Sequence, residues 1–364
     1  MARNGFPHVF TGIVFFVCAV LLLGSGPVQA QSLEETLNSL SETAGKEYVK
    51  PIVNGFGANM NGGWFHKAPS SKIFGIDFEF GMVAMGAFLD EGAQTFSTSG
   101  NFNFSQAQAM QLVSGMTFPT TTVRDAVVSQ LMATPYTVGI SGATAIGAED
   151  DNIMVSFRGD DVVVGPTTYS VPVQDIDLGV GGLLNDVTMI PYAAPQFGIG
   201  TVYGTQATFR YLPDIELNED IGSIKYFGFG IQHNPLVWVP ADFVVPVDVC
   251  LSFYTQTLEV GTVFESSTTA FGLNASRDFS ALIVGFRPYA GIMFEKAEMD
   301  FTYDYNVDTG AGGIVTNQVA FSLESANTNR ITVGAAFKLL MLNLNIDYSI
   351  ANTNTVSGGL FFAF

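Results

Sequence analysis

Apolar and polar residues alternate with a period of two along most of the chain. In residues 73–85, for example, Phe74, Phe78 and Phe80 alternate with Asp77 and Glu79. Successive side chains of a strand point to opposite faces, so this pattern predicts strands with one apolar and one polar face. The other segments that read in this way are residues 54–65, 197–211, 226–234, 247–256, 268–276, 282–303, 319–325, 330–339, 341–350 and 354–364. Within 282–303 the parity changes near Lys296, which predicts a β-bulge.

The composition of the polar faces separates two kinds of β-protein. A soluble sandwich carries Lys, Glu and Asp on its polar face, whereas these strands carry mainly Gly, Asn, Ser, Thr and sparse charges. The apolar face continues through roughly eleven strands, as lipid contact demands. We therefore expect an all-β fold, a transmembrane antiparallel up-and-down β-barrel of about twelve strands, within a range of ten to fourteen.

The last segment is apolar at every second position from Val356 to the final residue, with Leu360, Phe362 and Phe364 among them. This predicts that the chain ends in a membrane strand, which pairs with the first strand to close the barrel. Phe362 and Phe364 are expected to face lipid and to serve recognition by the barrel-assembly machinery.

The N-terminal region predicts export. Residues 1–30 combine Arg3, an apolar run at 12–23 and small residues before Ala30, as in a cleaved signal peptide. Residues 31–51 read as an amphipathic helix that starts at a capping box of Ser32 and Glu35 and ends at Pro51. This helix could plug the lumen, close the periplasmic mouth or lie on the surface. No later apolar run is long enough for a membrane helix, so strands must do the crossing.

Residues 91–192 interrupt the alternation of the barrel domain, which is expected to span 52–364. Within them, 120–133 predicts a helix, 153–157 and 161–171 predict a hairpin, and 179–184 predicts a loop. A segment this long is expected to be a plug, a cap or an extracellular loop. It could hold selectivity for a ligand or partner, or cover the barrel passively.

Charge and composition exclude several classes of function. The chain carries a formal net charge of −19, and phosphate binding needs a basic face, so nucleic acid is not expected as a partner. After removal of the signal peptide only Cys250 remains, so no disulfide can form within the chain. Neither a metal-ligand motif nor a phosphate loop is present, and no cofactor is expected.

Three segments, residues 48–65, 195–213 and 225–249, resemble an uncharacterised family of Gram-negative outer-membrane barrels known mainly as a domain of unknown function. Residues 342–350 (LNLNIDYSI) are similar to its penultimate strand. The resemblance implies a location in the outer membrane and a barrel architecture, with no substrate and no catalytic residues. The long-chain fatty acid transporters, which pair a barrel with an N-terminal plug, offer a looser analogy.

Charged residues on the polar faces are the candidate lumen residues. They could form paired networks in a plugged barrel or line a water-filled path. These residues are Asp77, Glu79, Arg210, Asp248, Arg287, Glu295, Glu324, Arg330, Lys338 and Asp347. Trp64, His233 and Trp238 are expected at the membrane interface, where aromatic belts occur.

Two main functions remain open. The first is porin-like passage or uptake of a small, hydrophobic or amphipathic solute through a restricted lumen. The second is a structural or surface-binding barrel that transports nothing. A lipid hydrolase is a third and weaker hypothesis, because His66 and His233 are the only histidines after the signal peptide and no Ser lies in an activating motif. We therefore do not expect an enzyme.

Overall fold

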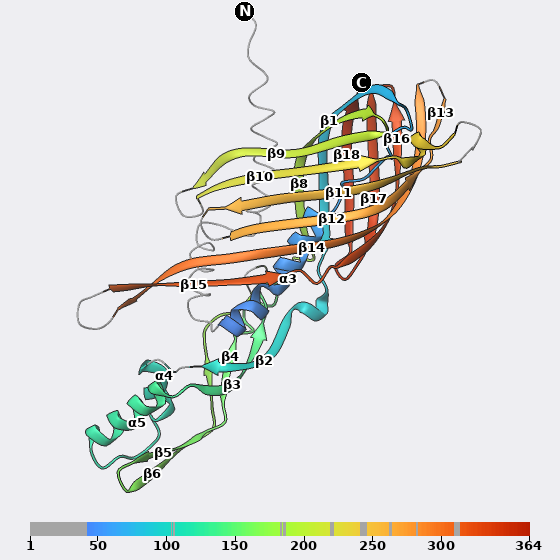
Figure 1. Ribbon diagram of the computed structural model, residues 1–364. Coiled ribbons are helices and arrows are strands. Elements are labelled where there is room, and N and C mark those ends of the chain that lie inside the picture. Colours follow the sequence, from blue (N-terminus) through green and yellow to red (C-terminus); the bar gives the residue numbers. More distant parts are fainter. Residues whose placement is uncertain are drawn as a thin grey trace, which may run out of the picture. The chain divides into compact units, whose positions relative to one another are not determined.

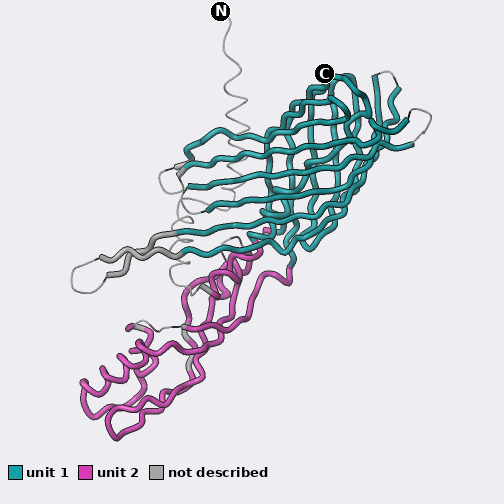
Figure 2. Tube along the Cα trace, in the orientation of Figure 1, with its two compact units in different colours: residues 1–31, 52–90, 188–364 teal, residues 32–51, 91–187 magenta. Residues whose placement is uncertain are grey.

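The computed structural model describes residues 42–102, 104, 106–182, 184, 187–218, 222–240, 246–261, 264–281, 283–308 and 314–364. The expected signal peptide and residues 31–41 of the expected helix lie outside these ranges. The chain divides into two compact units (Figure 2). Unit 1 comprises Met1–Gln31, Ile52–Asp90 and Thr188–Phe364, and unit 2 comprises Ser32–Pro51 and Glu91–Val187.

Unit 1 is a closed antiparallel β-barrel (Figure 1). Pairing of β1 with β18 and of β12 with β14 completes the ring, so the two terminal strands pair as expected. The ring strands are β1 (Phe74–Phe88), β8 (Met189–Val202), β9 (Thr205–Asn218), β10 (Gly222–His233), β11 (Asp248–Val260), β12 (Phe264–Ser276), β14 (Val284–Asp308), β16 (Asn329–Leu339), β17 (Leu342–Ile350) and β18 (Thr355–Ala363).

This ring confirms the all-β barrel and lies within the expected range, but the estimate of twelve strands is not confirmed for the ring. The twelve-stranded sheet also counts β13 (Phe279–Ala281) and β15 (Ile314–Glu324), which lie outside it. The only other element described between ring strands of unit 1 after β8 is a short 3-10 helix, η2 (Pro235–Trp238).

Strands β15 and β16 are two parts of one strand that pairs with β14 across a bulge. Glu298 pairs with Glu324 and Phe294 with Asn329, so four residues, 325–328, face three residues, 295–297. Strand β14 itself keeps its register with β12 throughout their pairing. The prediction of a bulge in β14 near Lys296 is therefore wrong, because the extra residue lies in the partner strand, at 325–328. The parity change has another cause: the outward residues of β14 turn from Ile292 and Phe294 to charged residues as the strand leaves the apolar band.

The outer surface of the ring carries a continuous apolar band. Every ring strand contributes a large apolar side chain that is 40% or more exposed: Phe80, Phe197, Tyr211, Phe227, Phe253, Phe271, Phe294, Phe337, Leu344 and Phe362. Exposed apolar surface on this scale is unfavourable in water and is typical of a barrel that faces lipid. Phe364 is also exposed, and its N–H donates to the carbonyl of Phe78 (2.9 Å), which fastens the seam.

The segment 197–211, expected as one strand, is instead two strands joined by a tight turn. Tyr203 and Gly204 form this turn with positive φ angles of 48° and 65°, a conformation that suits two-residue hairpins. A register shift between Gly200 and Val202 compensates for the turn, so odd-numbered residues face outward on both strands. The alternation therefore passes through the turn undisturbed.

Helix α3 (Glu42–Met60) corrects the predicted start of the barrel. The helix continues through Pro51, where it was expected to end, and replaces the strand expected at 54–65. Met60, an apolar residue of that expected strand, is fully buried. Among the described residues, no helix combines the length and apolarity needed to cross a membrane.

Unit 2 is an ordered domain rather than an irregular loop. Its four-stranded antiparallel sheet runs in the order β2 (Thr95–Phe102), β3 (Tyr136–Ala143), β4 (Met154–Phe157) and β7 (Gln174–Asp177). The other elements are η1 (Glu91–Ala93), α4 (Gln106–Leu112), α5 (Thr121–Ala133) and a hairpin of β5 (Asp160–Val164) with β6 (Thr167–Val171).

The predicted helix of unit 2 is confirmed by α5, whose N-cap Thr120 accepts a hydrogen bond from the N–H of Val123. The predicted hairpin is wrong in its pairing, because β4 pairs with β3 and β7, while β5 and β6 pair with each other.

Tyr48 of α3 donates its hydroxyl to the carbonyl of Gly181 (3.0 Å), and burial raises the pKa of Tyr48.

Candidate functional site: the barrel lumen

The lumen of the ring is occupied by the chain's own residues 52–72, which we call the plug. The plug comprises the second half of α3 and the segment that leads to β1 (Figure 1). Val53, Ala58, Met60, Trp64 and Phe65 are each at most 4% exposed. The contacts of Ala58, Met60 and Trp64, described below, are with inward-facing residues of the ring strands.

Glycines let the helical part of the plug lie close to the barrel wall. A Cβ atom added at Gly57 would lie 2.8 Å from the Cβ atoms of Ala297 and Ser325, and one at Gly55 would lie 2.5 Å from Ile190 Cδ1. Real Cβ atoms do not approach so closely. Glycine at these two positions therefore sets the distance between helix and wall.

Replacing Gly57 with valine is expected to push the plug helix away from β14 and to lower the stability of the barrel. The matched control is Gly75→Val, because a Cβ atom at Gly75 would meet nothing closer than 3.6 Å. Urea unfolding followed by the gel mobility of folded and unfolded barrel measures the effect. Equal midpoints for the two variants would contradict close packing of the helix at Gly57.

Two buried arginines cap the C-terminal end of the plug helix. Arg330 Nη2 donates to the carbonyl of Ala58 (2.7 Å), and Arg210 Nη2 donates to that of Gly62 (3.0 Å). Gln256 Nε2 also donates to the carbonyl of Met60. The last carbonyls of a helix lack partners within the helix and carry partial negative charge, so cations from the wall stabilise this end.

Arg330 also forms a buried ion pair with Glu295 of β14. Its Nε and Nη2 atoms donate to the two carboxylate oxygens at 2.6 and 3.0 Å, and the side chains are 1% and 0% exposed. This bidentate geometry fixes the guanidinium in the plane from which Nη2 reaches the helix. One residue therefore links β16, β14 and the plug.

Trp64 follows the helix end inside the ring and packs against residues of the wall. Its ring stacks on that of Tyr254 (centroids 4.9 Å apart), and the guanidinium carbon of Arg210 lies 3.9 Å from the ring centre. The indole N–H donates to the carbonyl of Met60 (3.0 Å). The prediction that Trp64 lies at the membrane interface is therefore wrong, because the wall encloses its side chain, which is 2% exposed.

A second ion-pair cluster holds the plug beyond Trp64. His66 Nε2 lies 2.9 Å from Glu79 Oε1, and Lys67 Nζ lies 2.6 Å from Glu79 Oε2. The His66 ring also stacks on Phe361 of β18 (centroids 4.8 Å apart). Glu79 on β1 is thereby held by the segment that precedes its own strand.

The plug leaves the lumen at the end of the ring where Tyr203 and Gly204 join β8 to β9, which we call the turn end. There Ala68 N–H donates to Ser276 Oγ (2.9 Å), and Asn234 Nδ2 donates to the carbonyl of Pro69 (2.7 Å). The hydroxyls of Ser70 and Thr201 are 3.2 Å apart. Contacts with β8, with β12 and with Asn234, the residue after β10, therefore hold residues 68–70 in place before the chain enters β1.

Five of the ten candidate lumen residues are buried within the ring: Glu79, Arg210, Glu295, Arg330 and Asp347. Asp347 accepts a hydrogen bond from the hydroxyl of Tyr289 (2.9 Å). Asp77 and Lys338 are exposed, and Asp248 and Arg287 are intermediate. The expectation for Glu324 is wrong: it lies on β15, outside the ring, and pairs with Lys296 while 63% exposed.

The opposite end of the ring, which we call the loop end, has an apolar inner wall that the sequence did not indicate. Leu212, Ile224, Leu258 and the partly buried Val260 and Phe264 belong to one cluster with Met60. Phe56 of the plug contacts this wall through Phe264 (ring centroids 6.1 Å apart). At this end the strands carry apolar residues on the inner face and charged residues on the outer face, which is the reverse of their pattern in the apolar band.

The expected interface residues His233 and Trp238 lie together at the turn end. Trp238 is 65% exposed and stacks on Tyr203 (centroids 5.6 Å apart), while its N–H donates to His233 Nε2 (3.2 Å). His233 Nδ1 lies 3.0 Å from the hydroxyl of Thr205. Both ring nitrogens of His233 are thus engaged. Among the described residues, no group of His, Cys, Asp and Glu could hold a metal ion.

Known proteins with related shape are barrels of bacterial outer membranes. One is Ail, the attachment invasion locus protein of Yersinia pestis (12% identity, 44% of this chain and 93% of Ail, TM-score 0.20). Another is the loop L8 deletion mutant of Vibrio cholerae OmpT (10% identity, 80% of this chain and 100% of that chain, TM-score 0.24). A third is the Pseudomonas putida toluene transporter TodX (8% identity, 87% of this chain and 96% of that chain, TM-score 0.19). Such low TM-scores carry nothing about solutes or partners over to this chain.

The sequence itself gives a firmer assignment than these structures. No curated protein matches the chain. A family of unknown function, DUF6588, matches residues 9–364, which agrees with the resemblance noted in the strand segments above. Nearly the whole chain is covered, so the protein belongs to the family of unknown function DUF6588.

Proposed function

We propose that the protein is a plugged outer-membrane barrel that takes up a small hydrophobic or amphipathic solute and does not conduct ions at rest. The observation that carries this proposal is the apolar inner wall at the loop end, formed by Leu212, Ile224, Leu258, Val260 and Phe264. An ion pathway would favour charged side chains at this position, whereas an apolar wall favours a solute with apolar surface.

Support for the membrane location comes from the outer surface. The apolar band runs round all ring strands and is closed at the seam of β1 and β18. Only lipid offers a continuous apolar surrounding to such a band. Assembly would then depend on β18 as the closing strand, whose Phe362 and Phe364 face outward.

Passage through the lumen requires the plug to leave the wall. The contacts that must break are those made by Arg210, Arg330 and Glu79, all on ring strands. A solute held at the loop-end wall would lie beside Phe56 and Met60 of the plug. Movement of the plug would couple solute binding to opening.

A disulfide between the plug and the wall tests this function. Gly57→Cys with Ser325→Cys places the two sulfurs in reach after the helix shifts slightly, since the Cβ atoms start 2.8 Å apart and a disulfide needs about 3.8 Å. We expect uptake of an apolar fluorescent dye by cells to stop when the disulfide is oxidised and to return on reduction. The single-cysteine variants are controls, and Cys250 is buried and does not compete.

The density of contacts on the plug favours a second candidate, a sealed barrel that acts as a structural or surface-binding platform. In that case the oxidised, reduced and wild-type proteins would give the same dye uptake as cells that lack the protein. Unit 2, inserted between β1 and β8, would then be the part that engages a partner.

A further inference from the structure

Exposed cations lie beside outward-facing apolar residues at the turn end of the ring. Arg277 follows β12, and its guanidinium carbon lies 4.9 Å from the ring centre of Phe279, which is 52% exposed. Ile283 and Leu340, also exposed, lie on neighbouring turns that are linked by a hydrogen bond from Leu340 N–H to the Ile283 carbonyl (2.7 Å). A cation therefore rests on apolar surface where the outer band ends.

Two more cations act on Asp278, the residue that follows Arg277. Arg287 donates to Asp278, and Lys338 acts on the same carboxylate by its charge. Burial alone would raise the pKa of Asp278, but hydrogen bonds from Ser280 and Arg287 outweigh it and lower the pKa below its ordinary value. Asp278 is therefore ionised at neutral pH, and Arg287 and Lys338 act on its carboxylate in a chain whose net charge is −19.

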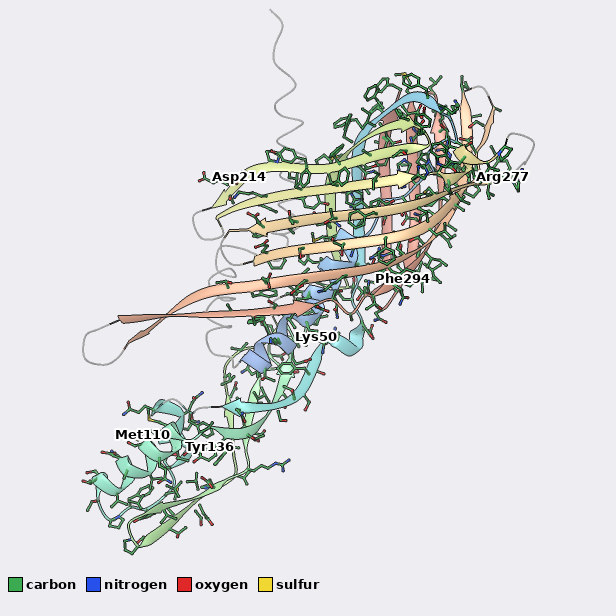
Figure 3. All side chains as sticks on the ribbon, in the orientation of Figure 1. Lys50, Met110, Tyr136, Asp214, Arg277 and Phe294 are labelled. Atoms are coloured by element: carbon green, nitrogen blue, oxygen red, sulfur yellow. The ribbon has the colours of Figure 1, made fainter. Side chains whose placement is uncertain are left out.

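The outer face at the loop end has the opposite character. Glu259 pairs with Glu265, and Glu265 pairs with Asp300, so carboxylates stand side by side on three neighbouring strands. Figure 3 shows Asp214 and Arg277 at opposite ends of the barrel. The outer face thus carries neighbouring carboxylates at the loop end and the exposed Arg277 at the turn end.

On the membrane location proposed above, we propose that Arg277 binds the phosphate of an anionic phospholipid at the turn end, with Arg287 and Lys338 adding positive potential. The acyl chains would lie along the outward side chains of Phe279, Val284 and Leu339, which are all more than half exposed. A guanidinium offers several donors in one plane, which suits phosphate oxygens. An anionic head group with apolar chains matches both parts of this surface.

Native mass spectrometry of the full chain, released from nanodiscs of equal parts phosphatidylglycerol and phosphatidylcholine, tests the site. Wild type is expected to retain phosphatidylglycerol over phosphatidylcholine. Arg277→Ala is expected to reduce that preference about fivefold. Lys225→Ala removes an exposed cation at the loop end and is expected to leave the preference unchanged.

Three outcomes would overturn the site. They are equal retention of both lipids by wild type, an unchanged preference in Arg277→Ala, and displacement of phosphatidylglycerol by excess inorganic phosphate, which would indicate an anion site without acyl contacts. Arg277→Lys keeps the charge and should retain part of the preference, which separates loss of binding from misfolding. Insertion into nanodiscs without a lipid preference would refute this site alone, whereas failure of wild type to insert would refute the proposed membrane location as well.

Discussion

Replacing Arg330 with alanine is expected to lower the free energy of unfolding by about 3–5 kcal/mol, the range found when one partner of a buried ion pair is removed. Glu295 would keep its charge in a site where its side chain is 0% exposed, and the carbonyl of Ala58 would lose its cap. Urea unfolding of the protein in lipid vesicles, followed by gel mobility, measures this loss.

Two further variants separate the buried charge from other effects. Adding Glu295→Gln to Arg330→Ala removes the unpaired carboxylate and is expected to restore part of the stability. Lys296→Ala removes a nearby cation whose pairs with Glu298 and Glu324 are exposed, so no measurable change is expected. A loss in Lys296→Ala as large as that in Arg330→Ala would show that burial of the pair is not the cause.

Replacing Trp64 with alanine is expected to cost about 3–5 kcal/mol and to open a leak through the lumen. The ring fills the space between Tyr254 and Arg210, and a Cβ atom at Gly228 would already lie 3.0 Å from it. Its removal leaves a cavity beside the guanidinium of Arg210, a polar group that water can solvate. Swelling of liposomes in a small sugar measures the leak.

The chain supplies its own control for this variant, because Trp238 is the only other tryptophan. Trp238 is 65% exposed at the turn end, so Trp238→Ala is expected to leave the liposomes tight. Equal swelling rates in the two variants, or none in either, would indicate that Trp64 does not seal the lumen.

The ring strands were predictable where their two faces meet different surroundings. In the ring strands, lipid selects apolar residues outside, and the crowded lumen selects small and polar residues inside, so parity alone placed Glu79, Arg210 and Arg330 on the inner face. Their partners were not predictable, because Arg330 meets the carbonyl of Ala58 across 272 positions of sequence. Parity gives the face of a residue and not the element opposite to it.

The plug was misread for a physical reason. Gly55 and Gly57 alternate with Asn54, Phe56 and Ala58, which imitates a strand, whereas the glycines in fact allow close contact of a helix with the wall. A helix enclosed on all sides also needs no apolar stripe, so the helical period is weak. The run of glycines continues to Gly62 and Gly63, and Gly63 has a positive φ of 64° where the helix has ended. That concentration of glycine was the available signal.

The prediction that Glu324 faces the lumen failed where its strand leaves the apolar band. Glu324 has the parity of the inner face when counted from β16, but the bulge at 325–328 reverses the parity on β15. A single extra residue therefore moved it outside. Sequence cannot place such a residue, because both strands alternate correctly on their own side of the bulge.

The central claim is that residues 52–72 close the lumen and that Arg210 and Arg330 hold them there. Ion conductance in planar bilayers, recorded for wild type and for the double variant Arg210→Ala with Arg330→Ala, tests it most directly. We predict a silent wild type and discrete current steps in the variant, because the capped end of the helix would be released. Steps of the same size and frequency in wild type would contradict the claim, since they would require a lumen that the plug does not close.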